Sequence, residues 1–358
     1  MPKTNKIIKL IKKDVRKLRA YEAPEIPCKV KLDAQENPYS LPENVRVKIL
    51  KALKPVLLNR YPDPGAKELK KIIADRIGAK TENIMLGNGS DELIQAIIMA
   101  FGGPSKKVLY PVPTFSMYGI ITRSLGQIPI EVQLKNDFDL DKNAMFSTIK
   151  KERPAVIFLS YPNNPTGNCF SRGMVIEIIR KSDAAVVIDE AYFDFSKKTF
   201  VPMLKDYENL IILRTLSKIG LAALRLGVLI ARPEIVREIN KVRLPYNVNS
   251  LSQRTAKVVL RNDRVIDKQI NAIIKERKGL YKRLLKMDGI TPFPSEANFI
   301  LFRTDNDASN KIFQRLIDKG ILVRNMNQKG LLNNCLRVTI GTPEENRRFL
   351  NALKTVSK

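Results

Sequence analysis

The stretch Leu210-Ile211-Ile212-Leu213-Arg214-Thr215-Leu216-Ser217-Lys218 decides the fold, because a short apolar run leads directly into polar residues. An earlier stretch of the same kind, Ala185-Val186-Val187-Ile188-Asp189, ends in an acid. Apolar runs of about four to six residues are typical of strands that are buried on both faces of a parallel sheet. We therefore read both stretches as central strands, one leading to Lys218 and the other ending at Asp189.

Similar apolar runs alternate with helical patterns over residues 84–231. The expected strands are Ile84–Leu86, Lys107–Tyr110, Ile128–Val132, Ala155–Ser160, Ala185–Asp189, Leu210–Leu213 and Leu226–Ala231, and the helices between them include Asp91–Phe101, Phe115–Ser124 and Arg172–Lys181. This alternation predicts an α/β fold with a sheet of about seven strands, mostly parallel and covered by helices on both faces. The connection from Leu213 to Leu226 is short, so the strands Leu210–Leu213 and Leu226–Ala231 could pair in antiparallel directions.

The flanking segments predict a second, smaller α+β domain. Its expected elements are long helices over residues 250–285, strands at Asn298–Arg303, Ile321–Arg324 and Leu336–Ile340, and helices at Asn310–Lys319 and Glu344–Lys354. Near the start of the chain, helices are expected over residues 7–19, 43–58 and 66–77. We expect residues 1–45 to form an N-terminal arm and part of the small domain, 46–245 the large domain, and 246–358 the small C-terminal domain.

Composition excludes several kinds of site. The chain of 358 residues has no histidine, which removes Ser-His and Cys-His nucleophile pairs and most zinc sites, so no metal site is expected. Its three cysteines, Cys28, Cys169 and Cys335, lie far apart and predict free thiols in a reducing compartment. Without an apolar run of membrane-spanning length, the expected location is the cytoplasm, with no membrane partner.

The formal net charge of +27 raises the question of nucleic-acid binding. However, the basic residues are spread along the chain and do not alternate with aromatic residues. A specific nucleic-acid partner is therefore not expected, and an anionic substrate explains the charge better. A basic nucleic-acid-binding protein is kept as the alternative from another class.

The loops that carry polar residues all follow expected strands. They are Gly87–Asp91, Pro111–Phe115, Tyr161–Gly167, Asp189–Tyr192 and Thr215–Lys218. Open α/β sheets bind ligands outside the carboxyl ends of their strands. The sequence therefore predicts one ligand site at this edge.

Lys218, Asp189 and Arg225 together suit pyridoxal 5'-phosphate (PLP). A lysine amine forms a Schiff base with its aldehyde, an acid pairs with its pyridinium nitrogen, and an arginine holds its phosphate. Asn164, fixed between two prolines, can donate to the ring hydroxyl, which Tyr192 can share. The remaining candidates are Phe115 for stacking on the ring, and Gly89, Ser90 and Ser217 for the phosphate.

Each of these residues also has a simpler interpretation. Ser90 or Asp91 could cap a helix, and Asn164 could belong to a rigid turn. Asp189 could be a helix cap or one half of a salt bridge, and Phe115 could be a core residue. Lys218 is one of many lysines.

Taken in order, nine segments resemble the fold-type I, PLP-dependent aminotransferases, and within them the histidinol-phosphate aminotransferases. The segments are Leu32–Tyr39, Arg60–Pro64, Gly87–Glu92, Pro113–Tyr118, Pro162–Gly167, Ile188–Tyr192, Thr215–Lys218 with Arg225, Ser295–Phe299 and Leu336–Gly341. Together they span nearly the whole chain. Three departures from the family pattern are a Lys218–Arg225 interval one residue shorter than the commonest form, Ala223 in place of a frequent glycine, and phenylalanine at position 115, where some members have tyrosine.

The resemblance implies roles for these residues. Lys218 would bind the cofactor, Asp189 would pair with the ring nitrogen, and Tyr192 and Asn164 would face the ring hydroxyl. Gly89, Ser90, Asp91, Ser217 and Arg225 would line the phosphate site. Tyr61 would reach the cofactor phosphate of a neighbouring subunit, which implies a homodimer. Arg337, supported by Arg324, would hold a substrate carboxylate or phosphate, and Tyr21 would help to close over the substrate.

The activity that the resemblance implies is transamination in L-histidine biosynthesis. L-Histidinol phosphate and 2-oxoglutarate would give imidazole acetol phosphate and L-glutamate. An aromatic amino-acid aminotransferase and a threonine-phosphate decarboxylase remain as alternatives on the same scaffold, because substrate choice depends on few side chains.

Overall fold

The structure is a computed structural model that describes residues 4–18, 20, 25–305 and 307–356. Within this part of the chain, seven strands form the large sheet in the spatial order β2-β8-β7-β6-β5-β3-β4. They are β2 (Ile84–Asn88), β3 (Lys107–Val112), β4 (Ile128–Gln133), β5 (Val156–Ser160), β6 (Ala185–Asp189), β7 (Leu210–Thr215) and β8 (Leu226–Ile230). Because β8 runs antiparallel to both neighbours while the others are parallel, the mostly parallel sheet and its antiparallel pair are confirmed.

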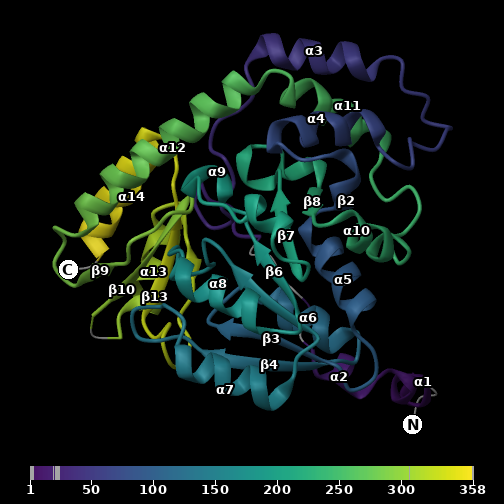
Figure 1. Ribbon diagram of the computed structural model, residues 1–358. Coiled ribbons are helices and arrows are strands. Elements are labelled where there is room, and N and C mark those ends of the chain that lie inside the picture. Colours follow the sequence, from purple (N-terminus) through teal and green to yellow (C-terminus); the bar gives the residue numbers. More distant parts are fainter. Residues whose placement is uncertain (1–3, 19, 21–24, 306, 357–358) are drawn as a thin grey trace.

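The central strands are buried because successive residues enter different apolar clusters. Val186, Ile188 and Ile212 belong to one cluster, whereas Val187 and Ile211 belong to another. The first cluster includes residues of α4 (Lys67–Ile77), α7 (Lys142–Glu152) and α8 (Arg172–Lys181), and the second includes residues of α5 (Ser90–Phe101), α6 (Met117–Ser124) and α10 (Pro233–Asn240). Helices therefore cover both faces of the sheet (Figure 1), which confirms the α/β class.

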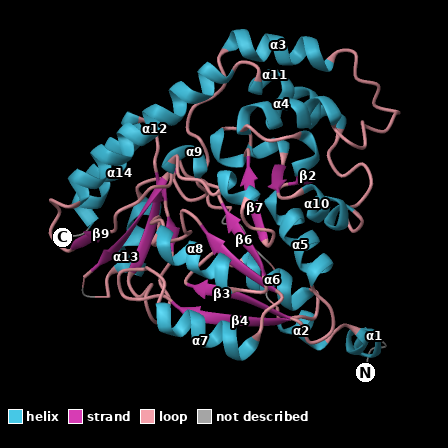
Figure 2. Cartoon of the chain, viewed as in Figure 1, coloured by secondary structure: helices cyan, strands magenta, loops and turns pink. Residues whose placement is uncertain are grey.

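A separate four-stranded antiparallel sheet has the order β12-β13-β10-β9. Its strands are β9 (Ile290–Pro292), β10 (Phe299–Thr304), β12 (Arg324–Asn325) and β13 (Cys335–Thr339). The helices α11 (Ser250–Leu260), α12 (Asp263–Leu284), α13 (Ser309–Asp318) and α14 (Pro343–Val356) occur in the same part of the sequence. A third apolar cluster joins β10 and β13 to α12, α13 and α14, and Figure 2 shows this second body beside the large sheet.

The direction of the strands places the polar loops together. Since β2, β3, β5, β6 and β7 are parallel, their carboxyl ends meet at one edge of the large sheet. Tyr192 and Ile219, which lie in loops of this edge, belong to the apolar cluster of the smaller sheet. The ligand edge is therefore packed against the second body.

Several expected elements differ in detail. The helix expected over 7–19 is two short helices, α1 (Thr4–Leu10) and α2 (Lys13–Lys17), and α3 (Glu43–Leu53) ends before residue 58. The strand expected at Ile321–Arg324 divides because β11 (Ile321–Leu322) pairs with β1 (Val30–Lys31), while β12 pairs with β13. Among the unforeseen elements are α7, α10 and β9. The division at residues 45 and 245 stays a prediction.

The short helical turns are α9 (Phe193–Ser196), η1 (Thr81–Asn83), η2 (Val201–Lys205), η3 (Ser217–Ile219) and η4 (Ala222–Leu224). Of these, η3 and η4 form the connection between Lys218 and Arg225. None of the described helices is both long and apolar enough to cross a bilayer.

Candidate active site

A cavity of about 110 Å³ lies at the carboxyl ends of the strands. The predicted residues that line it are Ser90, Asp91, Phe115, Asn164, Asp189, Tyr192, Ser217, Lys218 and Arg225. Gln35, Ser160, Ala191 and Thr215 complete its lining and were not foreseen. Side chains from the five loops that follow the strands, together with Gln35, thus meet at one small site.

Lys218 directs its amine into this site from η3. Its Nζ atom donates to the carbonyl oxygen of Ala34 at 3.4 Å and lies 5.9 Å from the ring centre of Tyr192. Burial of the amine, followed by the positive charge of Arg337, lowers the pKa of Lys218 to about 8. A larger share of the amine is therefore neutral near pH 7, as a nucleophile or general base requires.

Asp189 ends β6 and is 3% exposed. Its Oδ2 atom accepts a hydrogen bond from the Tyr118 hydroxyl at 2.7 Å, and its Oδ1 atom accepts one from the backbone N–H of Ala191 at 3.0 Å. Burial raises the pKa of Asp189 to about 6, and these two hydrogen bonds oppose the rise. Asp189 caps no described helix and forms no ion pair with a described residue, so both simpler interpretations are wrong.

Tyr118 is a site residue that sequence reasoning missed. It lies on α6, is fully buried, and stacks on Phe158 with ring centres 4.7 Å apart. Its ring also meets Phe115 edge to face at 5.6 Å. In the sequence, Tyr118 has the pattern of an ordinary core aromatic, and nothing local indicates that its hydroxyl faces Asp189.

The loop before α5 has the close backbone approach that a phosphate site needs. Gly89 has a φ of 84°, and a Cβ atom built on it would lie 2.5 Å from Nη2 of Arg225. Gly227 on β8 is also required, since its Cβ atom would lie 2.6 Å from the backbone nitrogen of Ser90. The role of Gly227 was missed.

The capping interpretation of Ser90 and Asp91 is wrong. Helix α5 begins at Ser90 with Gly89 as the N-cap, and no side chain caps it. The Asp91 carboxylate instead pairs with Arg225 at 3.1 Å. The shorter Lys218–Arg225 interval therefore still brings the arginine to this loop.

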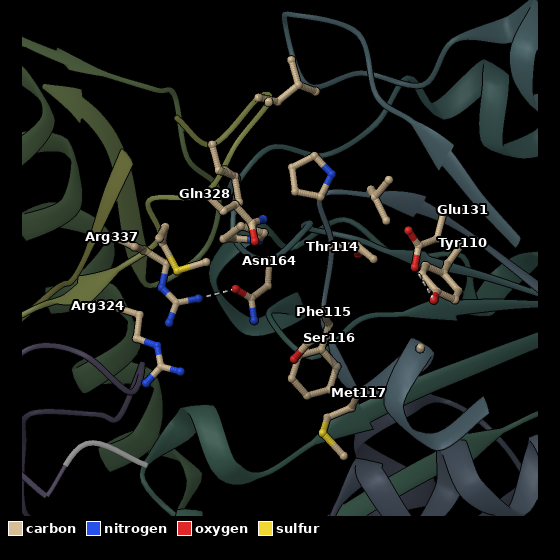
Figure 3. A pocket seen from close by; sticks show the side chains of 18 of the residues that line it. Tyr110, Thr114, Phe115, Ser116, Met117, Glu131, Asn164, Arg324, Gln328 and Arg337 are labelled. Atoms are coloured by element: carbon tan, nitrogen blue, oxygen red, sulfur yellow. Dashed lines mark hydrogen bonds between the residues drawn. The ribbon is translucent and has the colours of Figure 1, made fainter. Parts of the chain in front are cut away.

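A larger cavity of about 1550 Å³ adjoins the first and shares Lys218, Asn164 and Phe115 with it. Arg337 on β13 and Arg324 on β12, which are register partners, line it. Arg337 hydrogen-bonds to the side-chain oxygen of Asn164 and donates to the carbonyl oxygen of Asp33 at 3.1 Å. Figure 3 shows both guanidinium groups on one side of the cavity, with Tyr110 and Glu131 on the other.

Of the described predicted residues, Gly89 and Tyr61 line neither cavity, although Gly89 lies against Arg225. Tyr61 is 80% exposed and stacks on Tyr246 with ring centres 4.4 Å apart. Tyr21 lies outside the described residues. Phe115 lines the cavities and packs against Tyr118, so its packing is confirmed, while its stacking on the cofactor ring stays a prediction.

The chemistry of this donor set fits PLP. A buried carboxylate facing a cavity calls for a cationic partner, which a protonated ring nitrogen supplies. A glycine-rich helix start with an arginine suits a phosphate. Together with the lysine amine, these groups on a mostly parallel α/β sheet define a PLP-dependent enzyme of fold type I.

The comparison with protein families agrees with this class. The family described as aminotransferase class I and II matches residues 27–353. The chain belongs to this family and is an enzyme that transfers amino groups with pyridoxal 5'-phosphate as its cofactor.

Curated relatives match over nearly their full length. The histidinol-phosphate aminotransferase of Aquifex aeolicus is 47% identical over 346 residues, covering 96% of this chain and 97% of the relative. Histidinol-phosphate aminotransferase 2 of Nitrosococcus oceani is 44% identical, with 99% of each chain covered.

Solved structures share the fold. The histidinol-phosphate aminotransferase of Clostridium acetobutylicum is 28% identical with a TM-score of 0.83, covering 92% of this chain and 99% of that one. The Sinorhizobium meliloti histidinol-phosphate aminotransferase in complex with pyridoxal-5'-phosphate has a TM-score of 0.88 at 23% identity, with 96% of each chain covered. At that identity the likeness speaks for the fold alone, and it confirms the fold-type expectation.

Proposed function

We propose that the chain converts L-histidinol phosphate and 2-oxoglutarate into imidazole acetol phosphate and L-glutamate, a step of L-histidine biosynthesis. The names and high identities of the curated relatives support this substrate. The structural observation that carries the proposal is the pairing of Arg324 with Arg337 in the cavity that also contains Lys218. Two neighbouring guanidinium groups suit a substrate that bears a carboxylate or a phosphate.

The cofactor, when bound, supplies an electron sink for the charge that develops at the substrate's α-carbon. Lys218 would hold the cofactor and, once released, would move the proton at the α-carbon through Nζ. Asp189 would keep the ring nitrogen protonated. Tyr118 would orient Asp189 through its hydroxyl and stabilise its ionised form.

The other residues would position the reactants. Because Asn164 accepts from Arg337 through its side-chain oxygen, its amide N–H₂ group remains to donate to the ring hydroxyl, with Tyr192 beside it. Ser90, Ser217 and Arg225 would hold the cofactor phosphate with the backbone at Gly89. Arg337 would hold the α-carboxylate of glutamate or the phosphate of the other substrate, and Arg324 would assist it.

We also propose a homodimer, in which Tyr61 reaches the cofactor phosphate of the partner. Its segment also exposes two leucines, since Leu57 is 66% and Leu58 82% exposed. Tyr61 stacks on Tyr246, next to Leu244, which is 68% exposed. Contiguous exposed apolar residues of this kind are typical of an interface. Tyr21, in the N-terminal arm, would help to close the site.

Small-molecule substrates are the proposed partners, with no specific nucleic acid. The three free cysteines suit a reducing compartment such as the cytoplasm. The aromatic amino acids are the second candidate substrates, because Phe115 and Tyr110 also line the larger cavity.

A substrate panel tests the proposed specificity. Histidinol phosphate should give the highest kcat/KM among histidinol phosphate, phenylalanine, tyrosine and threonine phosphate. Arg324→Gln should raise the KM for histidinol phosphate by roughly ten- to a hundredfold, the cost of losing a charged hydrogen bond, and should affect phenylalanine much less. Arg232→Gln, which alters a distant surface pair with Glu208, is the control. A higher kcat/KM for phenylalanine would contradict the proposal.

Tyr118→Phe tests the newly found partner of Asp189. The hydrogen bond from Tyr118 lowers the pKa of Asp189, so its loss raises that pKa. The acid limb of the kcat/KM profile should therefore move to higher pH, and kcat should fall by roughly tenfold. Tyr207→Phe, in a tyrosine that lines neither cavity, should leave the profile unchanged. An unshifted acid limb in Tyr118→Phe would refute the assigned role.

A further inference from the structure

Directly after Asp189, Glu190 forms a buried ion pair that faces away from both cavities. Its side chain is fully covered, and it lines neither cavity. The Oε2 atom accepts from Nε and Nη2 of Arg214 at 3.0 and 2.8 Å. The carboxylate also accepts from the Thr199 hydroxyl at 2.8 Å and from the backbone N–H of Phe200 at 2.6 Å.

Arg214 makes further contacts of its own besides the ion pair with Glu190. Its Nη2 atom also donates to the Thr199 hydroxyl at 2.8 Å. Its guanidinium carbon lies 3.6 Å from the ring centre of Phe193, the residue that follows Tyr192. The pair therefore includes Glu190, which lies within the Asp189–Tyr192 segment, and contacts Phe193, which directly follows that segment.

The pair also joins the strand that carries Asp189 to the strand that leads to Lys218. Asp189 on β6 is the register partner of Leu213 on β7, and the Glu190 N–H donates to the Leu213 carbonyl at 2.8 Å. After Arg214, the Thr215 hydroxyl accepts from the backbone N–H of Ser217 at 3.1 Å. The backbone from Arg214 to Thr215, followed by this hydrogen bond, thus links the ion pair to Ser217, the residue before Lys218.

Stability alone is a weak reason for such an arrangement. A buried ion pair loses much of its Coulomb energy to the removal of both charges from water, and apolar residues of similar size often stabilise a fold as well. A buried, fully hydrogen-bonded pair does fix one geometry, because each bond specifies the direction of its partner.

We propose that Glu190 and Arg214 are a positioning pair that holds Asp189, Tyr192 and Lys218 in a common register around the cofactor. The inference rests on the proposed roles of those three residues. Glu190 and Arg214 themselves touch neither cofactor nor substrate, and they act through the backbone at Asp189 and Tyr192 and through the turn that ends at Lys218.

The test uses Glu190→Gln, Arg214→Lys and Arg214→Met in the full-length protein. Two quantities are measured: the Kd of the cofactor-free protein for PLP, and the pH midpoint of the absorbance change of the lysine-bound cofactor. Lys107→Met is the matched control, because it removes a partly buried ion pair with Glu152 at 2.9 Å at the other end of the sheet.

Arg214→Met should raise the Kd for PLP by about tenfold or more, the size seen when a group that orients a ligand-holding residue is lost. Its absorbance midpoint should move by more than about half a pH unit, because Asp189 no longer has a fixed place beside the ring. Arg214→Lys and Glu190→Gln should change the Kd for PLP and the absorbance midpoint in the same direction as Arg214→Met, but by less. Lys107→Met should lower the melting temperature without moving either quantity.

Unchanged affinity and midpoint in Glu190→Gln and Arg214→Lys, with a lower melting temperature alone, would overturn the proposal. These milder variants give the answer even if Arg214→Met does not fold. Failure of the wild-type protein to attach PLP at Lys218 would instead refute the proposed function, so the two failures are distinguishable.

Discussion

Replacing Lys218 with alanine is expected to reduce transamination at least about a thousandfold, because one residue serves as both cofactor anchor and general base. The structure places its amine in a cavity with Asp189, Asn164 and Arg225, and a pKa of about 8 makes a larger share of it neutral near pH 7 than in an exposed lysine. The measurement is the kcat of both half-reactions under saturating PLP.

The matched control is Lys181→Ala, which removes an exposed lysine that pairs with Glu177 on α8. It should keep the wild-type rate. Added methylamine should restore part of the lost activity to Lys218→Ala, since a free amine can replace the missing base. Wild-type turnover in Lys218→Ala would show that proton transfer depends on another group.

Replacing Asp189 with asparagine is expected to lower kcat by roughly 10²–10³-fold, the usual cost of removing a group that stabilises charge in the transition state. Asparagine keeps the size and the bond from Tyr118 but cannot stabilise a protonated ring nitrogen. Cofactor should still bind, so the effect should fall on kcat more than on KM. Steady-state kinetics and the absorption spectrum of the bound cofactor are the measurements.

Asp183→Asn is the control for Asp189→Asn, because Asp183 is an exposed acid just before the same strand. It should leave kcat and the spectrum unchanged. A small effect of Asp189→Asn, under about threefold, would mean that the ring nitrogen needs no carboxylate here, contrary to what the buried position of Asp189 indicates.

Much of the large sheet could be predicted from sequence because burial on both faces leaves a strong signal. The stretches at 185–188 and 210–213 are uninterrupted apolar runs, and the structure places alternate residues in two apolar clusters. Because neighbouring parallel strands run in the same direction, their carboxyl ends lie at the same edge of the sheet, where ligands bind. The meeting of Lys218 with Asp189 follows from this rule.

Features that depend on contacts between distant segments could not be predicted. The Tyr118 hydroxyl meets Asp189 only when α6 packs on the sheet, and Arg337 meets Asn164 only when the two bodies come together. The strand expected at Ile321–Arg324 divides because its two halves pair in different sheets. Apolar periodicity carries no information on such partners.

Short or exposed elements were missed for another reason. Helix α7 has one buried residue, Met145, so its apolar stripe is weak. Its start does have a local signal, because the side chain of Asp141 accepts from the backbone N–H of Ala144 at 2.8 Å. The close approach at Gly227 could not be foreseen, since it depends on the pairing of β8 with β2.

The most direct test of the central claim is reduction of the purified, PLP-loaded protein with borohydride, followed by digestion and mass spectrometry. The account predicts that the reduced cofactor is attached to Lys218, and that Lys218→Ala carries no such label at any specific lysine. Specific attachment to another lysine of the wild-type protein, with Lys218 unmodified, would contradict it.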